Sequence, residues 1–430
     1  MSPTKKIPSP IVSLFPIIIL IGMLFATIRT FGSDALNGGS QVSLLTTTAV
    51  CIFIGITFYR IPWKDYEIAI TNNIAGVSSA IIILLIIGAL SGAWMISGVV
   101  PTLIYYGMKI IHPDFFLTST CIICALVSIM TGSSWTTIAT IGIALLGIGK
   151  AQGFEEGWIA GAIISGAYFG DKVSPLSDTT VLASSVTDTP LFRHIRYMMI
   201  TTIPSLVITL IIFTVMGFTY ETSGTEQIAE FAASLNSRFH ITPWLLFKGT
   251  IMSLYGSTSL QSDSAMLTEL IATRGMAGMM NTIWLILCAM CFGGAMTASG
   301  MLGSITSVFV RFMKSTVSVV ASTVGSGLFL NLATADQYIS IILTGNMFSN
   351  IYEKKGYESR LLSRTTEDAV TVTSVLIPWN TCGMTQATIL SVSTLTYLPY
   401  CFFNLISPLM SILIAATGYK IIKKTVNNPG

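Results

Sequence analysis

Long apolar runs separated by very few charges constrain this chain more than any other feature of its sequence. Only 10% of the 430 residues are charged and 52% are apolar, and the mean hydropathy is +0.76. A water-soluble globule carries about a quarter charged residues, so this composition excludes that class. The runs fit bilayer-spanning helices, and the sequence predicts an all-α polytopic membrane protein of about 10–12 spans.

Several apolar segments are too short to cross a bilayer of roughly 30 Å, among them residues 99–111, 243–254 and 338–348. Short pieces at membrane depth are tolerated only where protein or a polar cavity covers their ends. We therefore expect broken or re-entrant helical hairpins. The last apolar run extends over residues 386–419.

The distribution of charge indicates both orientation and partners. The net charge is only +3, and no basic tract is long enough to hold a nucleic-acid backbone, so nucleic acid is excluded as a partner. Cytoplasmic loops of membrane proteins are enriched in Lys and Arg. Both termini are therefore predicted to be cytoplasmic, because such residues flank the first spans and the C-terminal end: Lys5, Lys6, Arg60, Lys64, Lys420, Lys423 and Lys424.

Seven cysteines lie mostly within apolar segments and are not accompanied by a histidine cluster. Buried, inert thiols are the favoured interpretation, and metal ligands are the alternative. The sequence predicts no resident cofactor.

Features of the first half recur in order in the second half. At one constant spacing Thr131 aligns with Thr334, Trp135 with Tyr338, Gly142 with Gly345 and Pro175 with Pro378, and Ser133 aligns with Asp336. Many secondary transporters consist of two related halves. We predict a first transmembrane repeat at residues 1–220, a polar linker at 221–240 and a second repeat at 241–430.

The first candidate transport segment, residues 158–188, is WIAGAIISGAYFGDKVSPLSDTTVLASSVTD. Pro175 removes a backbone donor and disfavours helical geometry at Ser174, so the helix should unwind there. The unwound turn offers carbonyl, hydroxyl and carboxylate oxygens, which a small hard cation prefers, and half-helix ends add partial charges. The predicted cation or proton ligands are Asp178, Asp171, Ser174, Ser177, Thr179 and Thr180.

The second candidate segment, residues 361–388, is LLSRTTEDAVTVTSVLIPWNTCGMTQAT. Pro378 interrupts it, Asn380 and Thr381 supply oxygen ligands, and Gly383 is expected to permit a turn. Trp379 is a secondary candidate. Two broken segments in corresponding positions of two halves point to a transport site.

The acidic residues of the first segment have structural alternatives. An unpaired carboxylate between apolar segments is expensive and usually functional, which favours Asp178 as the principal site residue. Ser177 or Asp178 capping the next helix is compatible with ligation. Asp171 belongs either to the site or to the water interface beside Lys172.

The acidic residues of the second half are secondary candidates. Asp336 is either a site residue or a helix N-cap. Glu367 and Asp368 are interpreted as an acidic pair at the membrane interface, with Asp368 also a candidate for the site.

Hydroxyl groups are concentrated in TGSSWTTIAT, residues 131–140. They either face a polar cavity or bond back to their own helix backbone and let neighbouring helices pack closely. The secondary site candidates here are Ser133, Ser134 and Thr136.

These stretches resemble a known family. GAYFGDKVSPLSDTT with LASSVTDTPLFRHIRYM is similar to the signature of NhaC-type Na⁺/H⁺ antiporters, and LSRTTEDAVTVTSVLIPWNTCG is similar to that family's second-half motif. The resemblance extends through TGSSWTTIATIGIALLGIG and covers most of the chain. It implies the ion transporter superfamily architecture, with two inverted repeats, each carrying a re-entrant hairpin, in the cytoplasmic (inner) membrane of a prokaryote.

The resemblance also implies roles for individual residues. They fall on Asp171, Ser174, Asp178, Thr179 and Thr180 in the first motif and on Pro378, Trp379, Asn380 and Thr381 in the second. The sequence departs from the family pattern at Val181, where an Asn is expected, and at Val375, where a Pro is expected.

The predicted function is secondary antiport, not enzymatic catalysis. We expect Na⁺ or Li⁺ to exchange for H⁺ by alternating access, with both ions competing for a carboxylate site near the bilayer midplane. The partners are Na⁺, H⁺ and the lipid bilayer, and a homodimer is an open alternative to a single chain.

Other functions remain as alternatives. A Na⁺/H⁺-coupled organic-acid exchanger of the malate/lactate type would hold a carboxylate with Lys172, Asn380 and half-helix N-termini. An intramembrane aspartyl protease needs two carboxylates sharing a proton, and neither Asp171 nor Asp178 stands in a Gly-x-Gly-Asp context. A passive channel is disfavoured by the duplicated breaks.

Overall fold

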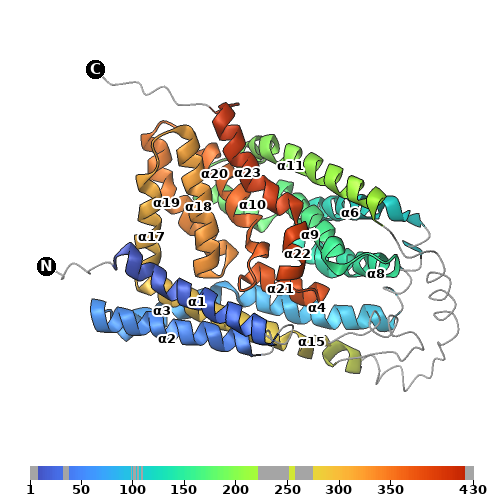
Figure 1. The fold of residues 1–430 in the computed structure, drawn as a ribbon, viewed down its shortest axis with the longest axis horizontal. Coiled ribbons are helices and arrows are strands. Elements are labelled where there is room, and N and C mark those ends of the chain that lie inside the picture. The colour runs from blue at the N-terminus through green and yellow to red at the C-terminus, as the bar shows by residue number, and fades with distance from the viewer. Residues whose placement is uncertain are drawn as a thin grey trace.

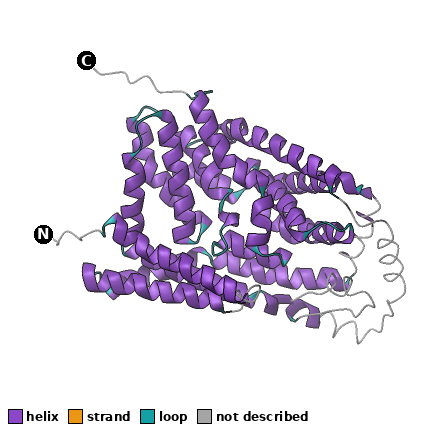
Figure 2. Ribbon diagram, in the orientation of Figure 1, coloured by secondary structure: helices purple, strands orange, loops and turns teal. Residues whose placement is uncertain are grey.

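The fold was analysed in a computed structural model, which describes residues 8–31, 38–97, 99, 103, 106–107, 110–220, 251–256 and 275–421. This part of the chain is helical and contains no strand (Figure 2). Its elements are α1 (Pro10–Phe31), α2 (Gly39–Tyr59), α3 (Trp63–Gly76), α4 (Ser78–Ile96), η2 (Pro113–Phe115), α6 (Phe116–Thr131), α7 (Ser134–Thr137), η3 (Ile138–Gly142), α8 (Ile143–Ala151), α9 (Glu156–Val173), α10 (Asp178–Val186), α11 (Leu191–Thr219), α15 (Gly275–Gly278), α16 (Met280–Ala298), α17 (Met301–Arg311), α18 (Thr316–Thr334), α19 (Gln337–Lys354), α20 (Ser359–Thr366), η4 (Glu367–Thr371), η5 (Ser374–Leu376), α21 (Thr381–Leu390), α22 (Thr394–Tyr397), η6 (Leu398–Tyr400) and α23 (Phe402–Thr417).

Eight helical stretches of the described residues are long and apolar enough to cross a membrane, and a bent pair raises the number to nine. This confirms an all-α polytopic membrane protein. The predicted number of spans was somewhat larger, about 10–12. The linker at residues 221–240 lies outside the described residues, as do most of the apolar segments at 99–111 and 243–254.

The helices form groups that place the interrupted segments in the interior. Helix α16 packs against α2 and α3, and α1 packs against α2 and α17. Figure 1 shows α1 to α4 along one side of the molecule, with α9, α10 and α21 to α23 toward its middle. Helix α6 packs against α9 over most of their length.

Glycines on α9 allow its close contact with α6. A Cβ atom on Gly166 would lie 2.1 Å from the carbonyl oxygen of Cys121, and one on Gly170 would lie 2.3 Å from that of Ala125. Small residues four positions apart let helix backbones approach in a membrane, where van der Waals packing replaces the hydrophobic effect between helices. This close contact fixes the position of the end of α9, where Asp171 lies.

The last apolar run, residues 386–419, does not form one continuous helix. Helix α21 ends at Leu390, where Ser391 adopts a left-handed backbone with φ of 54°. The chain then bends by 55° between residues 394–400 and 402–417. Pro399, in the short turn η6 before the bend, lacks the N–H that a continuous helix would need. The single run is therefore three helical pieces.

All seven cysteines are free thiols, and six of them are buried. Cys291 is partly exposed. Their positions agree with the interpretation of buried thiols.

Candidate cation site

The first helix break lies where the sequence predicts it. Helix α9 ends at Val173, Ser174 is extended, and α10 begins at Asp178 after the N-cap Ser177. The hydroxyl of Ser174 donates to the carbonyl of Ile129 at 2.8 Å, which ties the break to α6. Because residues 174–177 are non-helical, the end of α9 and the start of α10 both present backbone groups here.

The second break also follows the prediction, although its glycine acts differently. The chain is extended at Ile377, and α21 begins at Thr381 after the N-cap Asn380, whose side chain accepts from the Cys382 amide at 3.1 Å. The expected turn at Gly383 is wrong, because this residue lies within α21. A Cβ there would lie 2.0 Å from the Ile377 carbonyl oxygen, so the glycine permits close backbone contact.

Asp171 lies in the last turn of α9 and is only 4% exposed. Its Oδ2 accepts a 2.6 Å hydrogen bond from the hydroxyl of Ser134, the first residue of α7. Its Oδ1 has no hydrogen-bond partner among the described residues. The burial excludes the alternative that placed Asp171 at the water interface.

Ser134 reaches Asp171 because a tight turn precedes α7. Gly132 has a φ of 71°, and a Cβ on it would lie 2.6 Å from the side chain of Leu176 in the first break. Glycine is suited to this position because it adopts a positive φ without strain and has no Cβ to collide with Leu176. The turn between α6 and α7 therefore packs directly on the break after α9.

Asp178, the principal candidate from the sequence, is exposed in the structure. Its Oδ1 accepts from the Thr179 amide at 2.8 Å, and its Oδ2 accepts from the hydroxyl of Tyr338 at 2.6 Å. Tyr338 belongs to α19 and lies 160 positions further along the chain. No role was predicted for this tyrosine, although the alignment of Trp135 with Tyr338 pointed to the position.

Asp336 is the N-cap of α19 and is only 2% exposed. One carboxylate oxygen accepts from the Ile339 amide at 2.9 Å, and the other accepts from the Thr381 hydroxyl at 3.1 Å. The N-cap alternative is therefore present in the structure. The same carboxylate links α19 to the start of α21.

Asp368 and Lys172 form a fully buried ion pair between η4 and α9. The carboxylate of Asp368 also accepts from Thr201 at 3.1 Å and from Ser407 at 3.3 Å. The interfacial interpretation of Glu367 and Asp368 is wrong, because the structure buries both side chains completely inside the protein. Since Asp368 is already compensated, we leave it out of the candidate cation site.

The remaining predicted residues divide into two groups. The Thr180 hydroxyl donates to the Lys172 carbonyl at 3.0 Å, and the hydroxyls of Ser177 and Thr179 lie 3.0 Å apart, so these side chains line the first break. The others have separate contacts. Ser133 caps α7, Thr136 is exposed, and the Trp379 indole N–H donates to the Leu332 carbonyl.

Positions that are related by the constant spacing in the sequence have similar backbone geometry and capping roles. Gly132 and Ala335 are both left-handed, and the residues that follow them, Ser133 and Asp336, are both N-caps.

The hydrogen bond that Asp171 accepts also has a counterpart at the corresponding positions of the second half of the chain. The hydrogen bond from Ser134 to Asp171 corresponds in position to one from Ser374 to Gln337, at 2.8 Å. The shared spacing in the sequence is therefore accompanied by shared geometry.

The two breaks are connected through reciprocal packing. Helix α10 packs against α19, and α21 packs against η3. Tyr168 of α9 has electrostatic interactions with both Asp171 and Cys382, and the Cys382 thiol donates to Gln337 at 2.5 Å. Residues near both breaks are thus linked through a few side chains.

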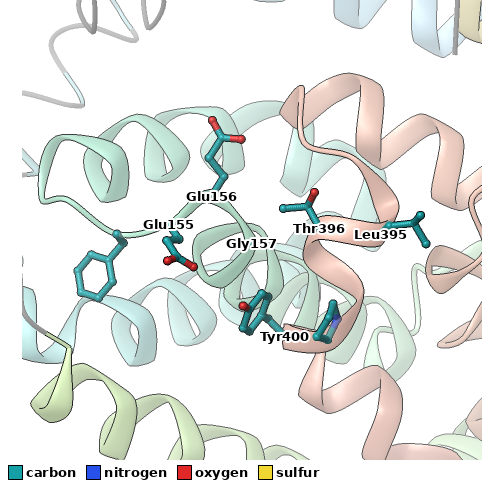
Figure 3. A pocket seen from close by; sticks show the side chains of 8 residues that line it. Glu155, Glu156, Gly157, Leu395, Thr396 and Tyr400 are labelled. Atoms are coloured by element: carbon teal, nitrogen blue, oxygen red, sulfur yellow. The ribbon is translucent and has the colours of Figure 1, made fainter. Parts of the chain in front are cut away.

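A surface pocket of about 610 Å³ lies elsewhere, between the start of α9 and the α22–η6 turn (Figure 3). Its lining includes Glu155, Glu156, Thr396 and Tyr400 and none of the predicted site residues. The candidate site therefore rests on the buried carboxylate and the helix breaks, not on this pocket.

Comparison with known proteins agrees with the architecture. A family model described as the Na⁺/H⁺ antiporter family matches residues 166–262 and 244–419. The malate-2H⁺/Na⁺-lactate antiporter of Bacillus subtilis is 35% identical, over 97% of this chain and 97% of that protein. The Na⁺/H⁺ antiporters NhaC of Bacillus subtilis and Alkalihalophilus pseudofirmus are each 34% identical, over 86% and 95% of this chain and 91% and 96% of theirs. These relatives are transporters, not enzymes, and the chain belongs to the Na⁺/H⁺ antiporter family.

Proposed function

We propose that this protein exchanges Na⁺ or Li⁺ for H⁺ and that Asp171 is the carboxylate that binds either ion. The observation that carries the proposal is the environment of the Asp171 side chain. It is buried at a helix break, with one oxygen held by Ser134 and the other without a partner among the described residues. At membrane depth such an oxygen is costly unless a cation or a proton satisfies it.

The surroundings of Asp171 suit exchange between a proton and a small cation. Ser134, Ser177 and Thr180 supply neutral oxygens close to the break. Helix α10 begins at Asp178, close to the break, and the partial positive charge at its N-terminal end favours an ionised carboxylate nearby. Hard monovalent cations bind to neutral oxygen ligands grouped around one carboxylate.

Asp178 serves in this proposal as the outer carboxylate of the same site. Its exposure and its hydrogen bond with Tyr338 support this role, because an exposed carboxylate can receive an ion from water. Asp171 then holds either Na⁺ or H⁺ in the interior. Exchange follows when only the occupied site changes sides, because an empty ionised carboxylate opposes closure.

The proposed alternating access uses two related repeats, residues 1–220 and 241–430, joined by the linker at 221–240. The corresponding contacts at Ser134–Asp171 and Gln337–Ser374 support this division. The lysines near both ends of the chain support cytoplasmic termini. A cytoplasm-specific reporter fused to the C-terminus should be active, and activity only of an externally active reporter would contradict this orientation.

Everted vesicles from an antiporter-deficient host test the central proposal. Addition of Na⁺ should dissipate an imposed pH gradient with the wild-type protein, and Asp171→Asn should abolish this response. Asp178→Asn should weaken it. Glu353→Gln is the matched control, because Glu353 is an exposed residue at the end of α19. An unchanged rate in Asp171→Asn would refute the assignment.

Carboxylate exchange is a second candidate, favoured by one observation. Arg364 is completely buried, and none of its three guanidinium nitrogens has a hydrogen-bond partner among the described residues. Its Nε lies 3.9 Å from Asp368, and its guanidinium carbon lies 4.8 Å from the ring centre of Tyr197. A buried guanidinium whose nitrogens have no such partners can bind a carboxylate through two parallel hydrogen bonds.

Labelled malate and lactate distinguish the two functions. Pure cation exchange predicts Na⁺-dependent pH changes without movement of either acid. Carboxylate exchange predicts uptake of labelled malate that Arg364→Lys reduces, since lysine cannot supply a bidentate contact.

A further inference from the structure

The surface pocket between the start of α9 and the α22–η6 turn has no role in the proposed cation site. Its volume of about 610 Å³ lies in the range of pockets that hold small molecules. Figure 3 shows Glu155 and Glu156 on one wall and Leu395, Thr396 and Tyr400 on the other. The pocket therefore combines carboxylates with apolar and aromatic side chains.

The two carboxylates of the pocket differ in their electrostatic compensation. Glu156 forms an ion pair with Lys150. Glu155 is exposed, and its carboxylate forms no hydrogen bond or ion pair with any described residue. Although Glu155 precedes α9, its side chain makes no capping bond to that helix. Within the described part of the chain, the pocket thus carries one uncompensated negative charge, which favours a ligand with one positive charge.

The opposite wall adds an aromatic surface. The ring centroid of Tyr400 lies 4.3 Å from that of Trp158, and this tilted contact supports the Tyr400 side chain. Gly157 leaves room for the ring, because a Cβ on this glycine would lie 2.6 Å from it. An aromatic ring in the same pocket as a carboxylate attracts organic cations, since its π face is electron-rich.

These features favour an organic ammonium ion over a metal ion. A metal ion needs several oxygen ligands around it, and the described residues contain no group of three acidic, histidine or cysteine side chains that could hold one. An alkylammonium ion needs one carboxylate for its charge and apolar contacts for its carbon atoms. Phe154, Leu395 and Pro399 line the pocket and can provide those contacts.

We propose that this pocket binds an organic ammonium ion, with Glu155 as its counterion and Tyr400 as its aromatic contact. A quaternary ammonium such as choline has the required single charge and an apolar surface that suits a ring face. Soluble amines and lipid headgroups both carry an ammonium group, and competition between them separates the two sources.

The walls of the pocket belong to elements that lead to the two helix breaks. Helix α9 starts at the pocket and holds Asp171 in its last turn. In α22, the hydroxyl of Tyr397 donates to the carbonyl oxygen of Val375 at 2.9 Å and lies 3.2 Å from that of Gly383, beside the second break. A ligand between these walls stabilises this arrangement relative to any in which they separate. Its binding should therefore slow transport, a consequence that rests on the proposed Na⁺/H⁺ exchange, whereas the site itself does not.

Titration of the purified full chain with choline, followed by saturation-transfer NMR, tests the site. The matched ligand is dimethylbutanol, in which a carbon atom replaces the charged nitrogen of choline. The wild type should bind choline and not the alcohol. Glu155→Gln should weaken choline binding about 5-fold through loss of the charge pair. Tyr400→Leu should weaken it about 3-fold through loss of the cation–π contact.

The control variant is Glu353→Gln, at another exposed glutamate, which should bind choline as the wild type does. Equal binding of choline and dimethylbutanol, or unchanged choline binding in Glu155→Gln, would overturn the site. Displacement of choline by vesicles that contain phosphatidylethanolamine would identify a lipid headgroup as the source of the ammonium group, and a lack of displacement would identify a soluble amine.

Transport measurements separate the site from the proposed function. Choline on both sides of the vesicle membrane should slow Na⁺/H⁺ exchange by the wild type more than exchange by Glu155→Gln. An unchanged wild-type rate would overturn the effect on transport, while the binding titration still decides the site. Absence of Na⁺/H⁺ exchange without choline would overturn the proposed function and leave the ammonium site intact.

Discussion

Tyr338 of α19 donates a 2.6 Å hydrogen bond to Asp178, the first residue of α10. The two residues lie 160 positions apart in the chain, so the start of one interrupted helix is held by a side chain from a distant part of the sequence. The charge of Asp178 is therefore partly stabilised across the structure, not only within its own hairpin.

Tyr338→Phe removes this hydrogen bond and keeps the aromatic ring. Hydrogen bonds to charged groups contribute about 1.5 kcal/mol at the low end, and Asp178 is exposed, so we expect about a 3- to 10-fold weaker apparent Na⁺ affinity. Vesicle assays over a range of Na⁺ concentrations measure it. Tyr419→Phe, at an exposed tyrosine near the C-terminus, is the control. Equal affinities in wild type and Tyr338→Phe would show that the bond is unimportant for binding.

Ser134→Ala removes the hydroxyl that donates to Asp171. This donor favours the ionised carboxylate, so its loss makes the proton harder for Na⁺ to displace. The pH of half-maximal exchange should rise by about one unit, which corresponds to about 1.4 kcal/mol. Rates measured across pH provide the test, with Thr140→Ala as control, because the Thr140 hydroxyl bonds only to its own helix. An unmoved or lower midpoint contradicts the prediction.

Single and double changes at the buried ion pair should affect stability differently. Lys172→Met removes the closer charged partner of Asp368 and leaves it with Arg364, whose Nε lies 3.9 Å away, so the cost should lie near the low end of the range for a broken buried pair, about 3 kcal/mol. Lys172→Met with Asp368→Asn removes both charges and should recover most of that loss. Thermal unfolding of the purified wild type and of the two variants in detergent measures these effects. A double variant no more stable than Lys172→Met would show that the two side chains are not energetically coupled.

Gly170→Ala should destabilise the contact between α9 and α6. The added methyl would lie 2.3 Å from the Ala125 carbonyl oxygen, so the helices must separate, at a cost of about 1–3 kcal/mol. Gly303→Ala is the matched control, since it adds the same group to a helix where nothing lies within 4 Å. Thermal unfolding should distinguish the two, and equal midpoints would argue against tight packing at Gly170.

The sequence predicted those parts of the fold that depend on local chemistry. Pro175 and Pro378 mark the two breaks because proline lacks the backbone donor of a continuous helix. Ser177 and Asp336 cap the helices that follow, as short polar side chains commonly do.

The parts that the sequence did not predict depend on contacts between distant residues. No local pattern shows that Lys172 pairs with Asp368 or that Tyr338 reaches Asp178. Gly383 was assigned a turn because glycine permits both turns and close contacts, and only the packed structure distinguishes them. The burial of Glu367 was missed for a similar reason, since adjacent acidic residues usually face water.

The seating of α10 on α19 and of α21 on η3 has a mechanical consequence. Each short helix packs on an element from a distant part of the sequence, so a tilt of either short helix would disturb the packing of the element beneath it.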